Sequence, residues 1–163
     1  MKRGIFYLLC AFASILFVSC LGNAGGSTAS WSANYQGTLT VTDMNDAVVY
    51  SKEEYKVTAE TANMIQLQPK LQLTFTDFKL EESMTPLTLV FVDVPSFITI
   101  PDDDSGLNYI VDVASATPYV DGVAVSEYEV EKLQGTIGKT NVQITFTMKQ
   151  QPYKVKFTIE SKQ

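Results

Sequence analysis

The stretch that decides the fold is VQITFTMKQQPYKVKFTIE, residues 142–160. Apolar and polar side chains alternate with a period of two on both sides of the polar break Gln150-Gln151-Pro152. A period of two places every second side chain on the same face of a β-strand, and one apolar face opposite one polar face is typical of antiparallel sheets. The stretch therefore predicts two half-buried strands joined as a hairpin.

The same alternation runs through most of the chain from Tyr35 onward, and it predicts about 8–10 strands and no long helix. Asp121-Gly122 lies between two short apolar pairs and predicts a two-residue hairpin turn. Residues 126–132 fit a strand poorly and could form a short helical turn. Many short strands of regular spacing are typical of a β-sandwich or a β-barrel.

Three segments depart from simple alternation. The apolar side chains change parity between Phe75 and Phe78, which predicts a bulge or bend near Thr76-Asp77. The charged section 52–56 indicates a bend inside a second strand. Residues 87–94 are apolar on both parities, and we expect this strand to be covered on both faces.

The N-terminus has the pattern of a secretory signal. Met1-Lys2-Arg3 is followed by an apolar run over residues 5–18 and then by Ser19-Cys20. The apolar run of about 14 residues is shorter than the roughly 20 needed for a transmembrane helix.

Residues 16–20 (LFVSC) resemble the lipobox of bacterial lipoproteins, although Phe17 stands where that family prefers Leu. The resemblance implies that residues 1–19 are removed and that Cys20 is the site of lipid attachment. An ordinary secretory signal cut elsewhere is the alternative. Since Cys10 would leave with the signal, a lipidated Cys20 leaves the mature chain without an internal disulfide.

Composition bounds what the mature chain can do. Removing the signal leaves 144 residues, with 10 basic and 18 acidic side chains and a formal net charge of −8. This charge repels phosphate backbones, so we expect no nucleic-acid partner. The chain contains no histidine, which removes the Ser-His-Asp and Cys-His pairings and most zinc sites.

Residues 20–34 read as the lipidated cysteine followed by a tether rich in Gly, Ser and Ala, with a reach of roughly 20 Å. Trp31 lies in this tether. We expect it to pack over one end of the domain; the alternative is an exposed aromatic platform for a sugar or for the membrane interface.

The segments Tyr35–Thr42, Leu73–Leu80 and Leu133–Ile137 resemble the calycin-like barrel domain of bacterial lipoproteins. The resemblance covers roughly residues 35–161, and we assign residues 35–163 to this domain. It implies an all-β fold, an antiparallel up-and-down β-barrel of lipocalin-like architecture. Members of this family largely lack an assigned function. A transmembrane barrel is disfavoured because a lipid anchor would be redundant and because residues 160–163 lack a closing aromatic side chain.

The acidic residues suggest two kinds of site, a calcium site and a pair of catalytic carboxylates. Residues 102–106 (DDDSG) could hold calcium through Asp102, Asp104 and a backbone carbonyl, or they could form a solvated turn, and we favour the turn. Glu53-Glu54 and Glu81-Glu82 are adjacent pairs, and neighbouring strand residues point to opposite faces. We expect no enzyme, no metal and no cofactor.

Two functions remain open. The first is a lipid-anchored envelope protein that binds a small hydrophobic ligand inside the barrel. The second is a packed barrel that engages an envelope protein or a glycan through its loops, around Asp102–Gly106 and Pro118–Val123. A small hydrolase is a third, weaker hypothesis. We expect the outer membrane of a Gram-negative bacterium, with the periplasmic face favoured.

Overall fold

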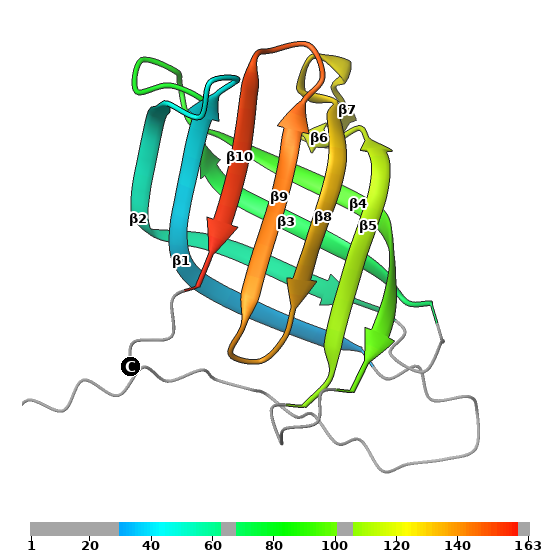
Figure 1. The fold of residues 1–163 in the computed structure, drawn as a ribbon. Coiled ribbons are helices and arrows are strands. Elements are labelled where there is room, and N and C mark those ends of the chain that lie inside the picture. The colour runs from blue at the N-terminus through cyan, green and yellow to red at the C-terminus, as the bar shows by residue number, and fades with distance from the viewer. Residues whose placement is uncertain (1–29, 63–67, 101–105, 160–163) are drawn as a thin grey trace, which may run out of the picture.

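The computed structural model describes residues 30–62, 68–100 and 106–159 of the 163-residue chain, and Figure 1 shows their arrangement. The described part contains ten strands and one short 3₁₀ turn, with no α-helix. Their bounds are β1 (Trp31–Asp43), β2 (Val48–Thr61), β3 (Lys70–Phe78), β4 (Leu87–Thr99), β5 (Asn108–Ala116), β6 (Tyr119–Val120), β7 (Val123–Ala124), η1 (Ser126–Tyr128), β8 (Val130–Ile137), β9 (Val142–Met148) and β10 (Tyr153–Thr158).

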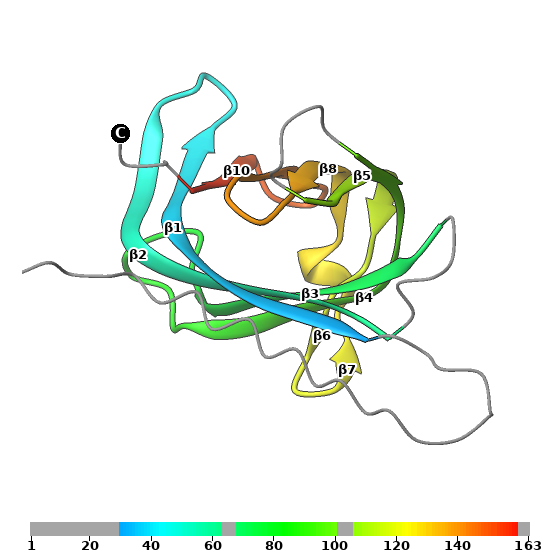
Figure 2. The same ribbon diagram turned by 90° about the horizontal axis from the view of Figure 1, so that it is seen from below.

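Eight of the strands close into an antiparallel up-and-down barrel. The order is β3-β2-β1-β10-β9-β8-β5-β4, and a further pairing of β3 with β4 closes the ring. Figure 2 shows the ring from below. The all-β fold and the up-and-down barrel expected from the sequence are thus confirmed.

The hairpin β6–β7 is inserted between β5 and β8. Tyr119 of β6 pairs with Val90 of β4, and β7 pairs only with β6. Asp121 and Gly122 have φ angles of 50° and 80°, which are the positive values that a type I′ hairpin turn requires at both central residues. The hairpin predicted from Asp121-Gly122 is confirmed. The short helical turn predicted over residues 126–132 is confirmed for residues 126–128 and is wrong for residues 130–132, which belong to β8.

The strands that define the alternation behave as predicted. All four apolar side chains of β9 are buried: Val142, Ile144, Phe146 and Met148. The intervening residues are exposed or half-buried. β9 pairs with β10 around the polar loop at Gln150–Pro152, so the deciding stretch forms the hairpin that it predicts.

Five register shifts interrupt the ladders, and four of them include a charged residue with a positive φ angle. These four fall between Gly37 and Leu39 of β1 against β2, twice between β3 and β4, and between Glu131 and Gln134 of β8 against β9. The fifth falls between Val41 and Thr42 of β1 against β2. The residues with positive φ are Glu54, Asp77, Asp93 and Lys132, at 55°, 56°, 53° and 51°. The bulge predicted at Thr76-Asp77 and the bend predicted in residues 52–56 are confirmed.

Aromatic side chains from opposite walls meet inside the barrel. The ring of Phe75 in β3 lies 5.5 Å from that of Phe146 in β9, between centroids. β3 and β9 are opposite each other in the ring order, so this contact crosses the interior. Phe75 also contacts Phe91, Phe78 and Tyr55 at 6.0, 6.4 and 6.5 Å. All five side chains are at most 2% exposed, so they fill the centre of the barrel with aromatic rings.

Two glycines serve the close approach of strands. A Cβ atom on Gly37 would lie 2.3 Å from the carbonyl oxygen of Thr158, and one on Gly135 would lie 2.4 Å from that of Gln143. Both positions therefore need the absence of a side chain. They do not enlarge the interior.

The structure corrects two expectations. The first strand begins at Trp31 rather than at Tyr35, because Trp31 to Gln36 already pair with β2. The Trp31 ring packs on Tyr109 at 4.9 Å, so the expected packing of Trp31 on the domain is confirmed. The expectation that residues 87–94 are covered on both faces is wrong at Val92. A barrel is a single layer of sheet, and Val92 is 39% exposed on its outer side.

The bulges generate a stability prediction. Glu54 makes no ion pair with another described residue, so a substitution there tests the backbone alone. Glu54→Val should lower the free energy of unfolding by about 1–2 kcal/mol, because a β-branched residue resists the left-handed conformation. Glu54→Gly should cost less than Glu54→Val, because glycine tolerates positive φ. Urea denaturation measures all three proteins.

The matched control is Glu53→Val, a neighbouring exposed residue with ordinary strand backbone. It should leave the stability within about 0.5 kcal/mol of the parent. An equal loss from the two valine substitutions would contradict the assignment of strain to residue 54.

Candidate interaction surface

Several residues singled out in the sequence fall outside the described residues. These are Cys20 and the acidic residues 102–105. Within the described ranges, no helix combines the length and the apolarity needed to cross a membrane. The same part of the chain contains no cluster of three or more His, Cys, Asp or Glu side chains arranged to hold a metal ion.

The paired acids lie at different places on the surface. Glu53 and Glu54 are both exposed at the β2 bulge. Glu81 and Glu82 are exposed in the connection between β3 and β4, and the hydroxyl of Tyr153 donates a hydrogen bond to Glu81. The structure does not bring the two pairs together at one described site.

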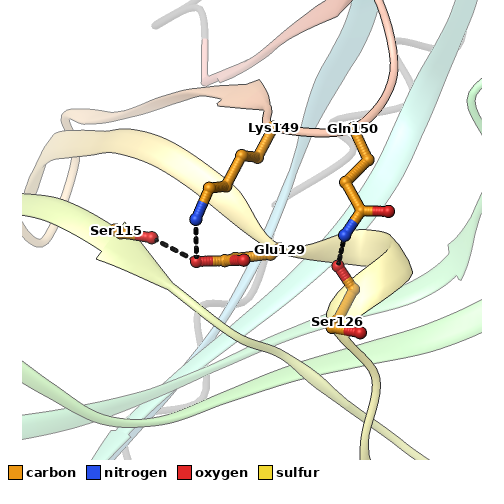
Figure 3. A network of polar contacts seen from close by, with 5 residues as sticks. All are labelled: Ser115, Ser126, Glu129, Lys149 and Gln150. Carbon is orange, nitrogen blue, oxygen red and sulfur yellow. Dashed lines mark hydrogen bonds and ion pairs between the residues drawn. The ribbon is translucent and has the colours of Figure 1, made fainter.

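A polar network at one end of the barrel joins a serine, a glutamate and a lysine, which are residue types that take part in catalysis in other proteins. Figure 3 shows Lys149 Nζ and Ser115 Oγ each donating a hydrogen bond of 2.8 Å to Glu129 Oε1. The hydrogen bonds from Lys149 and Ser115 lower the pKa of Glu129, and the hydrogen bond to Glu129 raises the pKa of Lys149.

The hydrogen bonds of this network indicate a structural role and not a catalytic one. A serine nucleophile needs a neighbouring group that takes its proton, and here the serine bonds to a carboxylate whose own pKa is lowered while the lysine stays charged. Gln150 Nε2 also donates to the Ser126 carbonyl oxygen at 3.0 Å. These bonds tie the η1 turn and the start of β8 to β5 and to the end of β9.

A charged hollow of about 510 Å³ lies beside β2 and the β3–β4 connection. The formal charges in its lining cancel, because it contains two lysines and two acidic residues: Lys52, Lys79, Asp77 and Glu82. Lys52 Nζ lies 4.0 Å from Asp77 Oδ2, and Lys79 Nζ donates to the Glu82 carbonyl oxygen at 3.0 Å. Burial, followed by the charges of Glu82 and Asp77, raises the pKa of Tyr50 at its edge. The hollow carries no charge excess that would attract an ion.

The outer face of β4 carries the apolar side chains Val90, Val92, Pro95 and Phe97, with the exposed Asp93 at the bulge among them. Phe97 is 47% exposed at the end of this face nearest the β4–β5 connection, and Ile110 of β5 lies directly opposite it. Tyr119 of β6 lies opposite Val90 in the same way, and residues directly opposite in an antiparallel pair share one face. We call this surface the β4 patch, and it consists of Val90, Val92, Pro95, Phe97, Ile110 and Tyr119.

Polar pairs border the β4 patch. Lys70 Nζ lies 3.7 Å from Asp93 Oδ1 on the β3 side. On the β8 side, Gln134 Nε2 donates a hydrogen bond of 2.9 Å to Asp112 Oδ1. An apolar centre with a polar rim is the usual anatomy of a protein–protein interface.

The loop region expected at Pro118–Val123 adjoins the β4 patch. It forms the β6–β7 hairpin, in which Val123 is 65% exposed. The strand face itself was missed in the sequence. Its signal was present, because residues 87–94 are apolar on both parities, but that pattern was interpreted as burial on both sides.

A comparison with family models, with curated proteins and with solved structures finds no significant match. The function of this chain must therefore be inferred from its own surfaces.

The network around Glu129 generates a prediction of pH dependence. A carboxyl group whose pKa is lower in the folded state than its ordinary value of 4.5 stabilises the fold above that value, and this contribution disappears as the pH falls through the folded pKa. Glu129→Gln should therefore be less stable than the parent at pH 7. The difference between the two proteins should shrink steadily as the pH falls below 4.5, in thermal melts at low salt.

Glu127→Gln is the control, because Glu127 belongs to the same turn and makes no ion pair with another described residue. Its difference from the parent should change less with pH. A Glu129→Gln difference that stays constant from pH 7 to pH 3 would rule out the stabilising role of the ionised carboxylate.

Proposed function

We propose that this chain is a lipid-anchored protein of the bacterial cell envelope, a calycin-like barrel that binds another envelope protein through the β4 patch. The observation that carries the proposal is the exposed apolar row on the outside of a filled barrel. Monomeric proteins rarely leave large contiguous apolar patches in water unless the patch is used for binding.

The filled interior favours this function over carriage of a hydrophobic ligand. Ligand sites are clefts or cavities of several hundred Å³, whereas here the rings of Phe75 and Phe146 meet across the centre. A ligand inside the barrel would have to separate these rings. The two hollows identified in the described structure, of about 510 and 370 Å³, are lined largely by charged and hydroxyl side chains of the outer surface and rim.

The proposed location follows from the N-terminal pattern around Cys20. The barrel begins only eleven residues after this cysteine, at Trp31. We place the anchor in the outer membrane of a Gram-negative bacterium with the domain on the periplasmic side, where the β4 patch would meet other envelope proteins.

Site-specific photocrosslinking in the source cells tests the partner. A photoreactive phenylalanine analogue at position 97 of the full chain should give one discrete crosslinked protein, because Phe97 is a large aromatic side chain of the row and is 47% exposed. The same analogue at Gln36, an exposed residue on β1 away from the patch, should not give this product. Adding Val92→Asp should remove the product by placing a charge in the interface.

Crosslinking of equal strength from positions 97 and 36 would contradict the proposal. So would a product that persists with Val92→Asp, or a product that contains only a second copy of this chain.

The anchor is tested separately by Cys20→Ser. The parent should incorporate labelled palmitate and sediment with the membrane fraction, because acyl chains supply the attachment. The Cys20→Ser protein should lose the label and the membrane association, whereas Cys10→Ser should change neither. Membrane association that survives Cys20→Ser would refute attachment through that cysteine.

A further inference from the structure

A second surface centres on β10, the strand opposite β4 in the ring, and reaches β8, where Gln134 also belongs to the rim of the β4 patch. β1, β10, β9 and β8 run side by side here (Figure 1), and their outward side chains line a hollow of about 370 Å³. Threonine, lysine and glutamine predominate in the lining: Thr40, Thr42, Thr145, Thr147, Lys132, Lys154, Lys156 and Gln134.

The strand registers place the lysines around the threonines. Lys156 lies between Thr40 of β1 and Thr145 of β9, and Lys154 lies between Thr42 and Thr147. β9 lies between β8 and β10, and adjacent strands are about 4.8 Å apart. The backbone at Lys132 on β8 is therefore about 10 Å from the backbone of β10, which carries the other two lysines. Ammonium groups thus border a row of hydroxyl groups on both sides.

The bulge in β8 adds Lys132 to this surface. Val130 and Leu133 both point into the barrel, although strict alternation would place them on opposite faces. The extra residue allows Glu131 and Lys132 both to face outward, and Lys132 adopts a φ of 51° to do so. Bulges that re-aim a side chain are common next to functional sites.

The surface carries excess positive charge on an acidic protein. Asp46 is the acid in the lining, and its carboxylate lies 2.7 Å from Lys154 Nζ. Lys132 and Lys156 make no ion pair with another described residue. Glu131 also faces outward on β8, directly opposite Thr147 of the lining and near Lys149, so the three lysines of the surface exceed its acids by one charge. Lys132 and Lys156, beside hydroxyl groups, are complementary to a ligand with separated negative charges and many hydroxyl groups.

We propose that this surface binds an acidic oligosaccharide, with its carboxylates on Lys132 and Lys156 and its hydroxyl groups on the threonines. Hydroxyl groups both donate and accept hydrogen bonds, so threonine and sugar hydroxyls pair in either sense. Nucleic acid fits less well, because its dense charge of one per about 1.7 Å of duplex is repelled by a protein of net negative charge.

Binding of a defined panel to the purified full chain tests this inference. The probes are oligosaccharides containing galacturonate, glucuronate or sialate, and fully methyl-esterified oligogalacturonate serves as the neutral match. At least one acidic probe should bind saturably, and for oligogalacturonate the methyl ester should bind more weakly. Lys132→Gln/Lys156→Gln should weaken binding by about tenfold or more, because it removes two charge-assisted contacts.

The matched control is Lys56→Gln/Lys139→Gln, which changes the net charge equally at two exposed lysines outside the hollow. It should leave the affinity within about twofold. The proposal is overturned if no acidic probe binds, if the neutral ester binds as well as the acid, if both double variants lose affinity equally, or if duplex DNA binds more tightly than every sugar. Crosslinking from position 97 is independent of these results, so this inference and the proposed function can fail separately.

Discussion

Closure of one sheet on itself is the constraint on which the rest of this structure depends. The pairing of β3 with β4 completes the ring, and every inward side chain must then fit a space of fixed width. Phe75 and Phe146 meet from opposite walls, so they set how closely those walls approach. A sheet must bend strongly to close around so small a core, and β-bulges supply local twist and bending. Five register shifts supply it here, and four of them place a charged residue in solvent.

The fold was predictable because inward and outward residues differ in polarity over most of the chain. The bulge at Asp77 was predictable for the same reason, since the buried residues change parity between Phe75 and Phe78. The bulge at Asp93 has the same cause, a change of parity from Phe91 to Val94. It was hidden because Val90 and Val92 are apolar as well. The pattern was therefore interpreted as a strand buried on both faces, and the β4 patch was missed.

The bulge at Lys132 was missed for a different reason. Val130 and Leu133 change parity, but the neighbouring residues 126–129 lack alternation, and the whole segment was interpreted as a weak helical turn. Likewise, the local sequence does not show what Gly37 and Gly135 do. Their role depends on the distance to Thr158 and Gln143, which are far away in sequence. Pairing between distant strands leaves no local signal of this kind.

A filled, single-layered barrel limits where function can reside. Its interior is occupied by its own side chains, so recognition must use the outer faces or the ends. Within residues 30–62, 68–100 and 106–159 no second layer covers the strands, and the composition of each outer face is therefore free to vary without loss of the core. On this chain the outer side chains differ between two sides of the barrel. The β3–β4–β5 side is apolar with a polar rim, whereas the β1–β10–β9–β8 side carries lysine and threonine. Among the described residues, Lys132 and Lys156 on the one side make no ion pair, and the other side exposes Val92 and Phe97. The two sides are therefore complementary to ligands of different chemistry, the first to a charged or hydroxyl-rich one and the second to an apolar one.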